Sequence, residues 1–393
     1  GTLEDFIAAP LAKRTWKGRL TSLRIGLRMF TSRLLGQHWV GGGAALQGRM
    51  FKRAIEAGVE FRVNAAVQRL LTDETGRVTG VSAKIDGHEV TISARLGVLV
   101  NAGGFSRNQR MRDQYMPGTR ADWSLVCEGD TGEMIEEMMR LGAATAQMDE
   151  MVGEAISLTP EPREIHAIVM PELAKPHSMV VDQSGQRYAR ETQSYQAYIR
   201  AIYQRDRTVA AIPSWQIMDS HYTSNYMVCE TMPWEPVPQR WIDAGFIKKG
   251  ETVAELALQC GMDPDVLVAS VERFNRFARN GKDEDFQRGD SAYDNFYADP
   301  TNKPVATLGP IEQGPFYAMP VYPGDIGTTG GAVTDIHARV LREDGTPIPG
   351  LYATGNSTAS VMGRAYPGGG ACVGPSMLWG YVAANHATGA QPG

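Results

Sequence analysis

Tyr366 stands just before three consecutive glycines in "YPGGG", and an apolar segment that predicts a helix follows them. A phenol can donate a hydrogen bond to a substrate oxygen, and glycine leaves the backbone N–H open to a ligand. The first N–H groups of a helix have no partner within it, and the helix dipole makes that end positive. The pattern therefore predicts a site for an anion or an electron-rich ring edge, which suits a flavin or a phosphate. A core tyrosine beside an ordinary glycine turn is the alternative.

Two further glycine-containing segments follow predicted strands. The apolar run "GVLVNA" predicts a buried parallel strand, and Ala102, Gly103 and Gly104 come at its end. The strand "GLYATG" ends at Gly355 and Asn356. Because ligands of open α/β sheets bind beyond the carboxyl ends of the strands, we expect a cofactor at these tips. An ordinary tight turn is the alternative for residues 102–104.

The elements that must position these residues can be read from periodicity and from helix-ending residues. Alternating apolar and polar residues around Gly76 and Gly87 predict a β-meander. Residues 156–327 are richer in Pro and Trp and contain one clear helix, in "PDVLVASVERFNRFARNG". The chain has 393 residues, so we expect two domains, the second one inserted into the first. Further helices are predicted over residues 44–57, over residues 130–141 with Asp130 and Thr131 as caps, and over residues 374–386.

Composition narrows the class of protein. A hydrophobic content of 42% and a charged content of 21% are typical of a folded protein. The net charge of −5 argues against a nucleic-acid partner. Four scattered cysteines without a CxxC pair predict neither structural zinc nor a disulfide framework, and they fit a reducing cytoplasm. We find no signal peptide and no apolar run that could span a bilayer.

Residues 11–40 carry a strong charge bias, with seven Lys or Arg and no Asp or Glu. Within this segment, apolar residues recur at three- and four-residue spacing and predict one apolar stripe on a basic helix. One interpretation is a surface helix packed on its own domain. The other is peripheral contact with an anionic membrane through residues 17–35. The stripe consists of Leu20, Leu23, Leu27, Phe30 and Leu34.

Several stretches together resemble a known family. "TTGGAVTD", "GVLVNAGGFSRN", "VVDQSGQRYARETQSY" and "GLYATGNSTASVMGRAYPGGGACVGPSM" are similar to the 3-ketosteroid Δ1-dehydrogenases. These are FAD enzymes of the succinate dehydrogenase/fumarate reductase flavoprotein superfamily. The resemblance implies an α/β, Rossmann-like FAD domain over residues 1–155 and 328–393, interrupted by an α+β catalytic domain over residues 156–327. The chain contains no G-x-G-x-x-G, so we expect the N-terminal βαβ unit of the FAD domain to be missing.

The resemblance also implies roles for individual residues. Tyr366 and the N–H of Gly370 would bind the ketone of a 3-ketosteroid, and Tyr195 would remove the proton from C2. Tyr222 and Tyr226 are weaker alternatives for this base. An external electron acceptor would reoxidise the FAD, and no metal is expected. The residues expected to contact FAD are Val67, Ala102, Gly103, Gly104, Asp130, Gly355, Asn356, Val373 and Met377.

Other functions remain open at this point. Within enzymes, the alternatives are a Δ4-dehydrogenase of ketosteroids and a fumarate-type reductase, although "YPGGG" offers no cation to clamp a dicarboxylate. Outside enzymes, the alternative is a non-catalytic fragment that binds a steroid or a partner. The absent dinucleotide motif is what supports that last interpretation.

Overall fold

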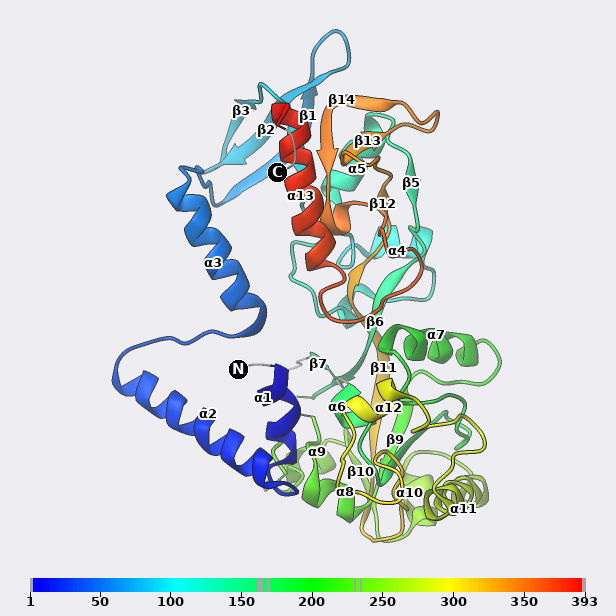
Figure 1. Cartoon of the computed structure of the whole chain (residues 1–393). Helices are drawn as coiled ribbons and strands as arrows, with labels where there is room; N and C mark the ends of the chain where they lie inside the picture. The colour runs from blue at the N-terminus through cyan, green and yellow to red at the C-terminus, as the bar shows by residue number, and fades with distance from the viewer. Residues whose placement is uncertain (1–2, 161–164, 168–169, 230, 234, 391–393) are drawn as a thin grey trace. The chain divides into compact units, whose positions relative to one another are not determined.

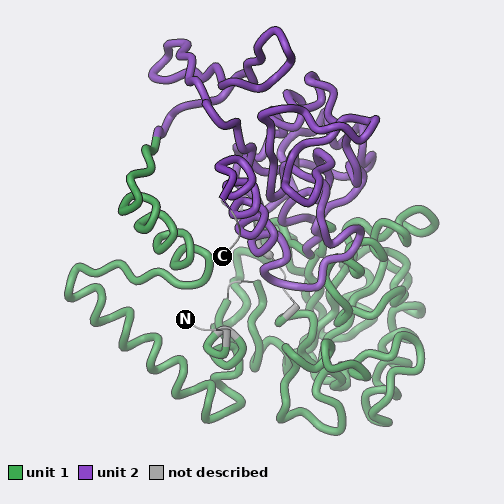
Figure 2. Tube along the Cα trace, turned by 45° about the horizontal axis from the view of Figure 1, so that its top comes forward, with its two compact units in different colours: residues 1–61, 155–323 green, residues 62–154, 324–393 purple. Residues whose placement is uncertain are grey.

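The structure is a computed structural model that describes residues 3–160, 165–167, 170–229, 231–233 and 235–390. The chain forms two compact units, coloured separately in Figure 2. Unit 1 contains residues 1–61 and 155–323, and unit 2 contains residues 62–154 and 324–393. Residues 1–61 thus group with residues 155–323, whereas the sequence analysis placed them with residues 62–155. The assignment of these segments to an FAD domain and a catalytic domain stays a prediction.

Unit 2 begins with an antiparallel meander, which confirms the predicted one (Figure 1). Its strands are β1 (Ala65–Thr72), β2 (Val78–Ile85) and β3 (His88–Ser93). Gly76 and Gly87 form the two turns with φ of 78° and 85°, a region that glycine enters without strain. β2 alternates between buried and half-buried residues from residue 78 to residue 82, whereas β3 is exposed throughout.

A second sheet of unit 2 positions the glycine-containing loops that follow β4 and β14. It has the order β13 (Arg339–Leu341), β14 (Pro347–Ala353) and β4 (Val98–Val100). β14 and β4 are parallel, with Ala353 aligned to Val100, so both strands deliver their following loops to one edge. The prediction of a parallel strand is confirmed. The prediction that it is buried is only partly right, because Leu99 remains 42% exposed.

Helices and short strands complete unit 2. The last helix, α13 (Val373–Thr388), packs on β14 through Tyr352, Ala383 and Trp379. The predicted helix after residue 130 is α5 (Glu133–Arg140), but its N-cap is Gly132, without a side-chain cap, so the predicted caps were wrong. The other elements are α4 (Gln109–Tyr115), η2 (Ala121–Trp123), β5 (Thr145–Ala146), β12 (Gly331–Ala332) and η3 (Gly355–Ser357).

Unit 1 is organised on one sheet and the predicted long helix. The sheet order is β7–β6–β11–β9–β8, and β10 also pairs with β11. α11 (Pro264–Asn280) packs its apolar face against this sheet through a shared core that includes Leu267, Val271 and Phe274. Gly281 ends the helix with φ of 71°. The strands are β6 (Met151–Leu158), β7 (Ile165–Ala167), β8 (Ser178–Val181), β9 (Ser214–Met218), β10 (Lys248–Gly250) and β11 (Phe316–Thr328).

Sequence analysis recognised one helix in this region, and the structure has several more. α7 (Tyr195–Asp206) is the longest of them, and its N-cap Ser194 accepts a hydrogen bond from the N–H of Ala197. The rest are α6 (Met170–Leu173), α8 (Ser220–Asn225), α9 (Gln239–Asp243), α10 (Val253–Gln259) and α12 (Ala292–Phe296).

The N-terminal helices of unit 1 are α1 (Leu3–Ala8), η1 (Ala9–Leu11), α2 (Trp16–Leu34) and α3 (Gly42–Glu56). α2 packs closely on η1 at Gly18, where a Cβ would lie 2.6 Å from the carbonyl of Leu11. The predicted leucine stripe, in contrast, is 56–70% exposed along its length. It is therefore not the face that packs on unit 1. None of the helices in the described part of the chain has the length and hydrophobicity that a bilayer span requires.

Candidate active site

The loop after β4 is held in place by one buried carboxylate. Asp130 accepts hydrogen bonds from the N–H of Gly104 at 2.6 Å and from the N–H of Ser106 at 3.1 Å. Gly103 has φ of 81°, and a Cβ there would collide with the same carboxylate. A Cβ on Gly104 would collide with Thr328 Oγ1. Asp130 therefore shapes the strand tip instead of capping α5, and both glycines are required by close packing.

The tips of β4 and β14 are joined by side chains from both loops. Ser357 Oγ accepts a hydrogen bond from the N–H of Ala102 and donates one to the carbonyl of Gly103, both at 2.9 Å. Gly355 has φ of 65°, and a Cβ there would collide with Asn101 Oδ1. The structure thus brings Ala102, Gly103, Gly104, Asp130 and Gly355 into one cluster. Their direct contact with a cofactor stays a prediction.

The glycine loop after Tyr366 is open on the side where a ligand would lie. Gly368 and Gly370 have φ of 141° and 101°, and a Cβ on any of the three glycines would meet no atom within 4 Å. Gly369 has neither an unusual backbone angle nor a close neighbour that explains it. α13 begins directly behind this loop, and its N-cap Cys372 makes no side-chain cap. The positive helix end without a side-chain cap and the bare backbone thus form a cradle, and among the described residues no side chain fills the space next to the three glycines.

A small pocket of about 20 Å³ lies beside this cradle in unit 2. Thr329, Asn356, Tyr366 and Cys372 are among the residues that line it. The Thr329 hydroxyl is buried and has no hydrogen-bond partner among the described residues. A buried hydroxyl without a partner is costly, so a polar group from a ligand is expected to complete it. The cradle, the helix end and this hydroxyl all fit the electron-rich pyrimidine edge of a flavin.

An ion-pair cluster anchors the loop that carries Tyr366. Arg364 contacts both carboxylate oxygens of Asp149 at 2.9 Å and Glu150 Oε1 at 2.5 Å. These pairs lie at the surface, where each contributes little to stability by itself, but together they fix the direction of the loop. No local pattern in the sequence indicates this anchor, because the partners lie more than two hundred residues apart.

The remaining predicted cofactor residues lie on regular elements. Val67 is on β1, next to a bulge, and packs partly buried against the core of unit 2. Val373 and Met377 lie in the first turns of α13 and are 42% and 43% exposed. Their roles stay predictions.

Tyr195 is the first residue of α7, in unit 1, and is half-buried. The positive end of the helix dipole lies at this position. Tyr222 and Tyr226, the two alternatives for the base, are less suited to this role. Burial raises the pKa of both phenols. The Tyr222 hydroxyl donates to the carbonyl of Glu172, and the Tyr226 hydroxyl donates to Asp299. Tyr366 and Gly370 belong to unit 2, whereas Tyr195 belongs to unit 1.

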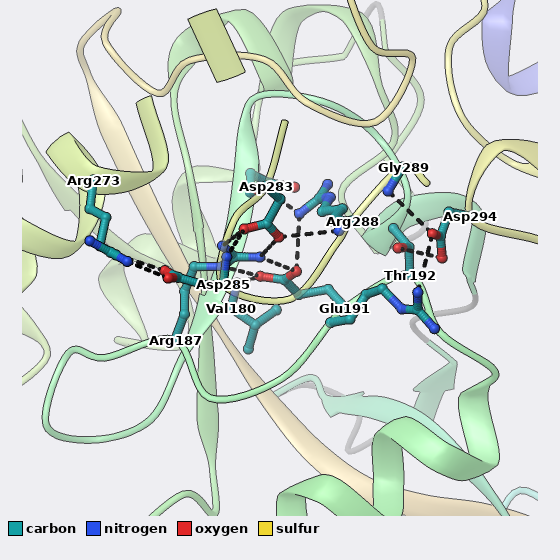
Figure 3. A network of polar contacts seen from close by, with 12 residues as sticks. Val180, Arg187, Glu191, Thr192, Arg273, Asp283, Asp285, Arg288, Gly289 and Asp294 are labelled. Atoms are coloured by element: carbon teal, nitrogen blue, oxygen red, sulfur yellow. Dashed lines mark hydrogen bonds and ion pairs between the residues drawn. The ribbon is translucent and has the colours of Figure 1, made fainter. Parts of the chain in front are cut away.

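A buried network holds the segment that leads into α7 (Figure 3). Arg187 binds Glu191 at 2.9 Å and Asp283 at 3.0 Å, and Arg288 lies 3.4 Å from Glu191. Burial by itself raises the pKa of Glu191, but the two guanidinium groups outweigh burial and hold this pKa at about 2. Arg190 lies 3.6 Å from Asp294. Both arginines near Tyr195 in sequence are therefore paired with carboxylates.

Comparison with known proteins identifies the family. The model for the FAD binding domain family matches residues 12–373. The chain is 38% identical to a 3-oxosteroid 1-dehydrogenase of Mycobacterium tuberculosis, over 98% of this chain and 69% of that protein. It is 36% identical to a 4-oxocyclohexanecarboxylate 2-dehydrogenase of Sinomonas cyclohexanicum, over 89% of this chain and 62% of that protein.

Among solved structures, it matches a 3-ketosteroid Δ1-dehydrogenase of Sterolibacterium denitrificans in complex with 1,4-androstadiene-3,17-dione. The TM-score is 0.93 at 35% identity, and the match covers 99% of this chain and 71% of that one. The predicted fold class and the predicted cofactor are confirmed. The chain belongs to the FAD-dependent flavoenzyme family of the 3-oxosteroid 1-dehydrogenases.

Proposed function

We propose that this protein introduces the C1–C2 double bond into 3-ketosteroids. The C2–H bond releases its proton to a base, the C1–H bond releases hydride, and the two electrons left by the C2–H bond form the new double bond. Bound FAD would supply the hydride acceptor, and an external electron acceptor would restore its oxidised form. The relatives described above, whose names specify ketone substrates, support this assignment.

The open glycine loop of unit 2 is the observation that carries the proposal. The C2 proton is only weakly acidic, and its removal places negative charge on the ketone oxygen. Hydrogen bonds from the Tyr366 hydroxyl and the Gly370 N–H would stabilise that charge. The loop leaves the backbone of Gly368–Gly370 uncovered, as a flat substrate lying against it requires.

Tyr195 is the base in this proposal. Its place at the start of α7 supports the role, since a phenol with an ordinary pKa near 10 needs a favourable field to ionise. The buried phenols of unit 1 are disfavoured. Burial raises the pKa of Tyr188 to about 12 and also raises the pKa of Tyr198 well above its ordinary value.

Substitution of Tyr366 by Phe tests the ketone site. Loss of one donor to a developing oxyanion typically lowers kcat by about 100- to 1,000-fold. Turnover of androst-4-ene-3,17-dione should therefore fall by this factor in Tyr366→Phe, while bound FAD, measured from its absorbance, stays at the wild-type level. Equal loss of FAD and turnover would mean that Tyr366 has a structural role. Tyr381→Phe, on the exposed face of α13, is the matched control and should retain both.

A monocyclic ketone is the second candidate substrate. The Sinomonas relative carries the name of a substrate with one oxocyclohexane ring, which presents the same ketone and adjacent CH groups. A comparison of kcat/KM for androst-4-ene-3,17-dione and 4-oxocyclohexanecarboxylate separates the two. The proposal requires preference for the steroid.

We also propose that α2 is a peripheral membrane contact. The leucine stripe is exposed, and the segment from residue 11 to residue 40 has seven cations and no anion. Apolar burial together with attraction to anionic lipid is the pattern of an interfacial helix. A membrane location would also suit a sterol-sized substrate.

Flotation with phosphatidylserine-containing vesicles tests this contact. Wild-type protein should float with the vesicles at low salt and should dissociate as salt rises. The double variant Leu23→Asp/Leu27→Asp should lose binding. Leu258→Asp, which changes another exposed leucine of unit 1, should retain it. Absence of wild-type binding at low salt would refute the contact.

A further inference from the structure

Thr329 is a buried residue of the candidate active site whose hydroxyl has no task within the protein. It directly follows β11 and lines the pocket beside the glycine loop of Tyr366. The residue is only 6% exposed, and its hydroxyl has no hydrogen-bond partner among the described residues. The residues that the sequence predicts to contact FAD do not include it.

The other hydroxyls in and beside these loops of unit 2 are used within the protein. The Thr358 hydroxyl, which lines the same pocket, donates to the carbonyl of Gly355 at 2.7 Å. Five further hydroxyls also have partners, namely those of Thr328, Thr354, Ser357, Ser360 and Ser376. The Thr329 hydroxyl differs from all of these, so it is left for a group from outside the chain.

The backbone around Thr329 is fixed and cannot turn the hydroxyl toward another partner. Its N–H donates to the carbonyl of Glu150 at 3.0 Å, and its carbonyl accepts from the N–H of Ser360 at 2.9 Å. A Cβ on Gly330 or on Gly331 would collide with the backbone of a neighbouring segment. The hydroxyl therefore stays at the wall of the pocket.

The start of α13 determines which kind of group the pocket favours. Ala371 and Cys372, which immediately precede α13, line the same pocket as Thr329. The positive end of the helix dipole favours an electron-rich group there. A volume of about 20 Å³ has room for one polar edge of a ligand or for one water molecule.

We propose that Thr329 donates a hydrogen bond to the pyrimidine edge of the bound FAD and thereby raises the reduction potential of the flavin. Reduced flavin carries negative charge on this edge, and hydrogen bonds to a charged acceptor are stronger than those to a neutral one. The hydroxyl therefore stabilises reduced FAD more than oxidised FAD. The inference depends on the FAD cofactor and does not require that the substrate is a steroid.

The midpoint potential of FAD in the purified holoenzyme tests the proposal without any substrate. Thr329→Val keeps the shape of the side chain and removes the hydroxyl. The ratio of reduced to oxidised FAD at a given potential should fall about tenfold, which lowers the midpoint by about 30 mV for a two-electron couple. Thr329→Ser keeps the hydroxyl and should stay close to wild type. If Thr329→Val fails to fold, Thr329→Ala removes the same hydroxyl and should show the same shift.

Thr307→Val is the matched control for this measurement. Thr307 is a buried threonine of unit 1 whose hydroxyl also lacks a partner among the described residues, and its substitution should leave the potential unchanged. An unchanged potential in Thr329→Val would mean that the hydroxyl faces a water molecule, which would overturn the proposal. An equal shift in Thr329→Ser and Thr329→Val, or a wild-type protein that holds no FAD, would overturn it as well.

A second measurement separates this inference from the proposed function. In Thr329→Val, the equilibrium constant for reduction of the bound FAD by androst-4-ene-3,17-dione should also fall about tenfold. Only this measurement rests on the proposed function. A protein whose potential shifts as expected but whose FAD is not reduced by the steroid would refute the proposed function and leave the role of Thr329 intact.

Discussion

Replacement of Glu191 by Gln would test how strongly the buried network before α7 stabilises the fold. Glu191 lies four residues before Tyr195, and its carboxylate neutralises two buried guanidinium groups, those of Arg187 and Arg288. Gln has a similar shape but no charge, so the variant leaves two buried cations with Asp283 as their remaining close counter-charge in the network. Breaking a buried pair by removing one partner is strongly destabilising.

The magnitude follows from the pKa of Glu191. Its pKa is about 2 in the folded chain, compared with an ordinary value of 4.5. At neutral pH the ionised carboxylate therefore stabilises the fold by roughly 3 kcal/mol. Because the folded pKa is the lower one, this stability is fully present above pH 4.5 and is lost as the pH falls toward 2. Urea unfolding of Glu191→Gln at pH 7 should show a midpoint lower by about 1 M, for an m-value of about 3 kcal/mol/M.

Glu312→Gln is the matched control in the same unit. Glu312 pairs with Arg279 at 2.5 Å, but both side chains are more than half exposed. Its loss should cost less than about 1 kcal/mol. If the two variants unfold at the same urea concentration, the buried network does not have the role assigned to it here. A parallel pH titration of the wild type gives an independent answer when Glu191→Gln fails to fold. The urea midpoint should then fall between pH 4.5 and pH 2.

Three further predictions concern unit 2. Asp130→Asn replaces one of the two carboxylate oxygens that accept hydrogen bonds from Gly104 and Ser106. The FAD content after purification should therefore fall at least tenfold. Asp113→Asn, on the exposed face of α4, should leave the FAD content unchanged. Arg364→Ala should lower kcat about 10-fold because the loop that carries Tyr366 loosens. In wild type, 0.5 M salt should weaken the same ion pairs and lower kcat toward the value of the variant. Arg120→Ala, which breaks another exposed ion pair, should leave kcat unchanged. Gly104→Ala should lower the melting temperature, because the added Cβ collides with Thr328. Gly369→Ala should leave the melting temperature unchanged and raise KM for the steroid. Equal melting temperatures for the two variants would contradict the packing argument.

Local patterns in the sequence were sufficient to predict much of unit 2. The meander, the strand at β4 and the helix behind Gly370 each depend on neighbouring residues, whose periodicity and glycines are visible in the sequence. The grouping of Gly103, Gly104 and Gly355 also followed, because parallel strands place their carboxyl ends together.

Contacts between distant segments were not predictable in this way. Asp130 looked like a helix cap, and only the fold brings its carboxylate to the N–H of Gly104. The partners of Arg187 include Asp283, which lies far along the chain, and no local pattern links them. For α2 the sequence left two interpretations open, packing on its own domain or contact with a membrane, because periodicity defines an apolar face without showing what covers it.

Anaerobic reduction of the bound flavin by steroid is the most direct test of the central claim. The purified protein should show the absorption bands of oxidised FAD, and one equivalent of androst-4-ene-3,17-dione should bleach them while androsta-1,4-diene-3,17-dione forms in equal amount. Tyr195→Phe should keep the bands and fail to bleach them. A wild-type protein that binds FAD but is not bleached by the steroid would contradict the account.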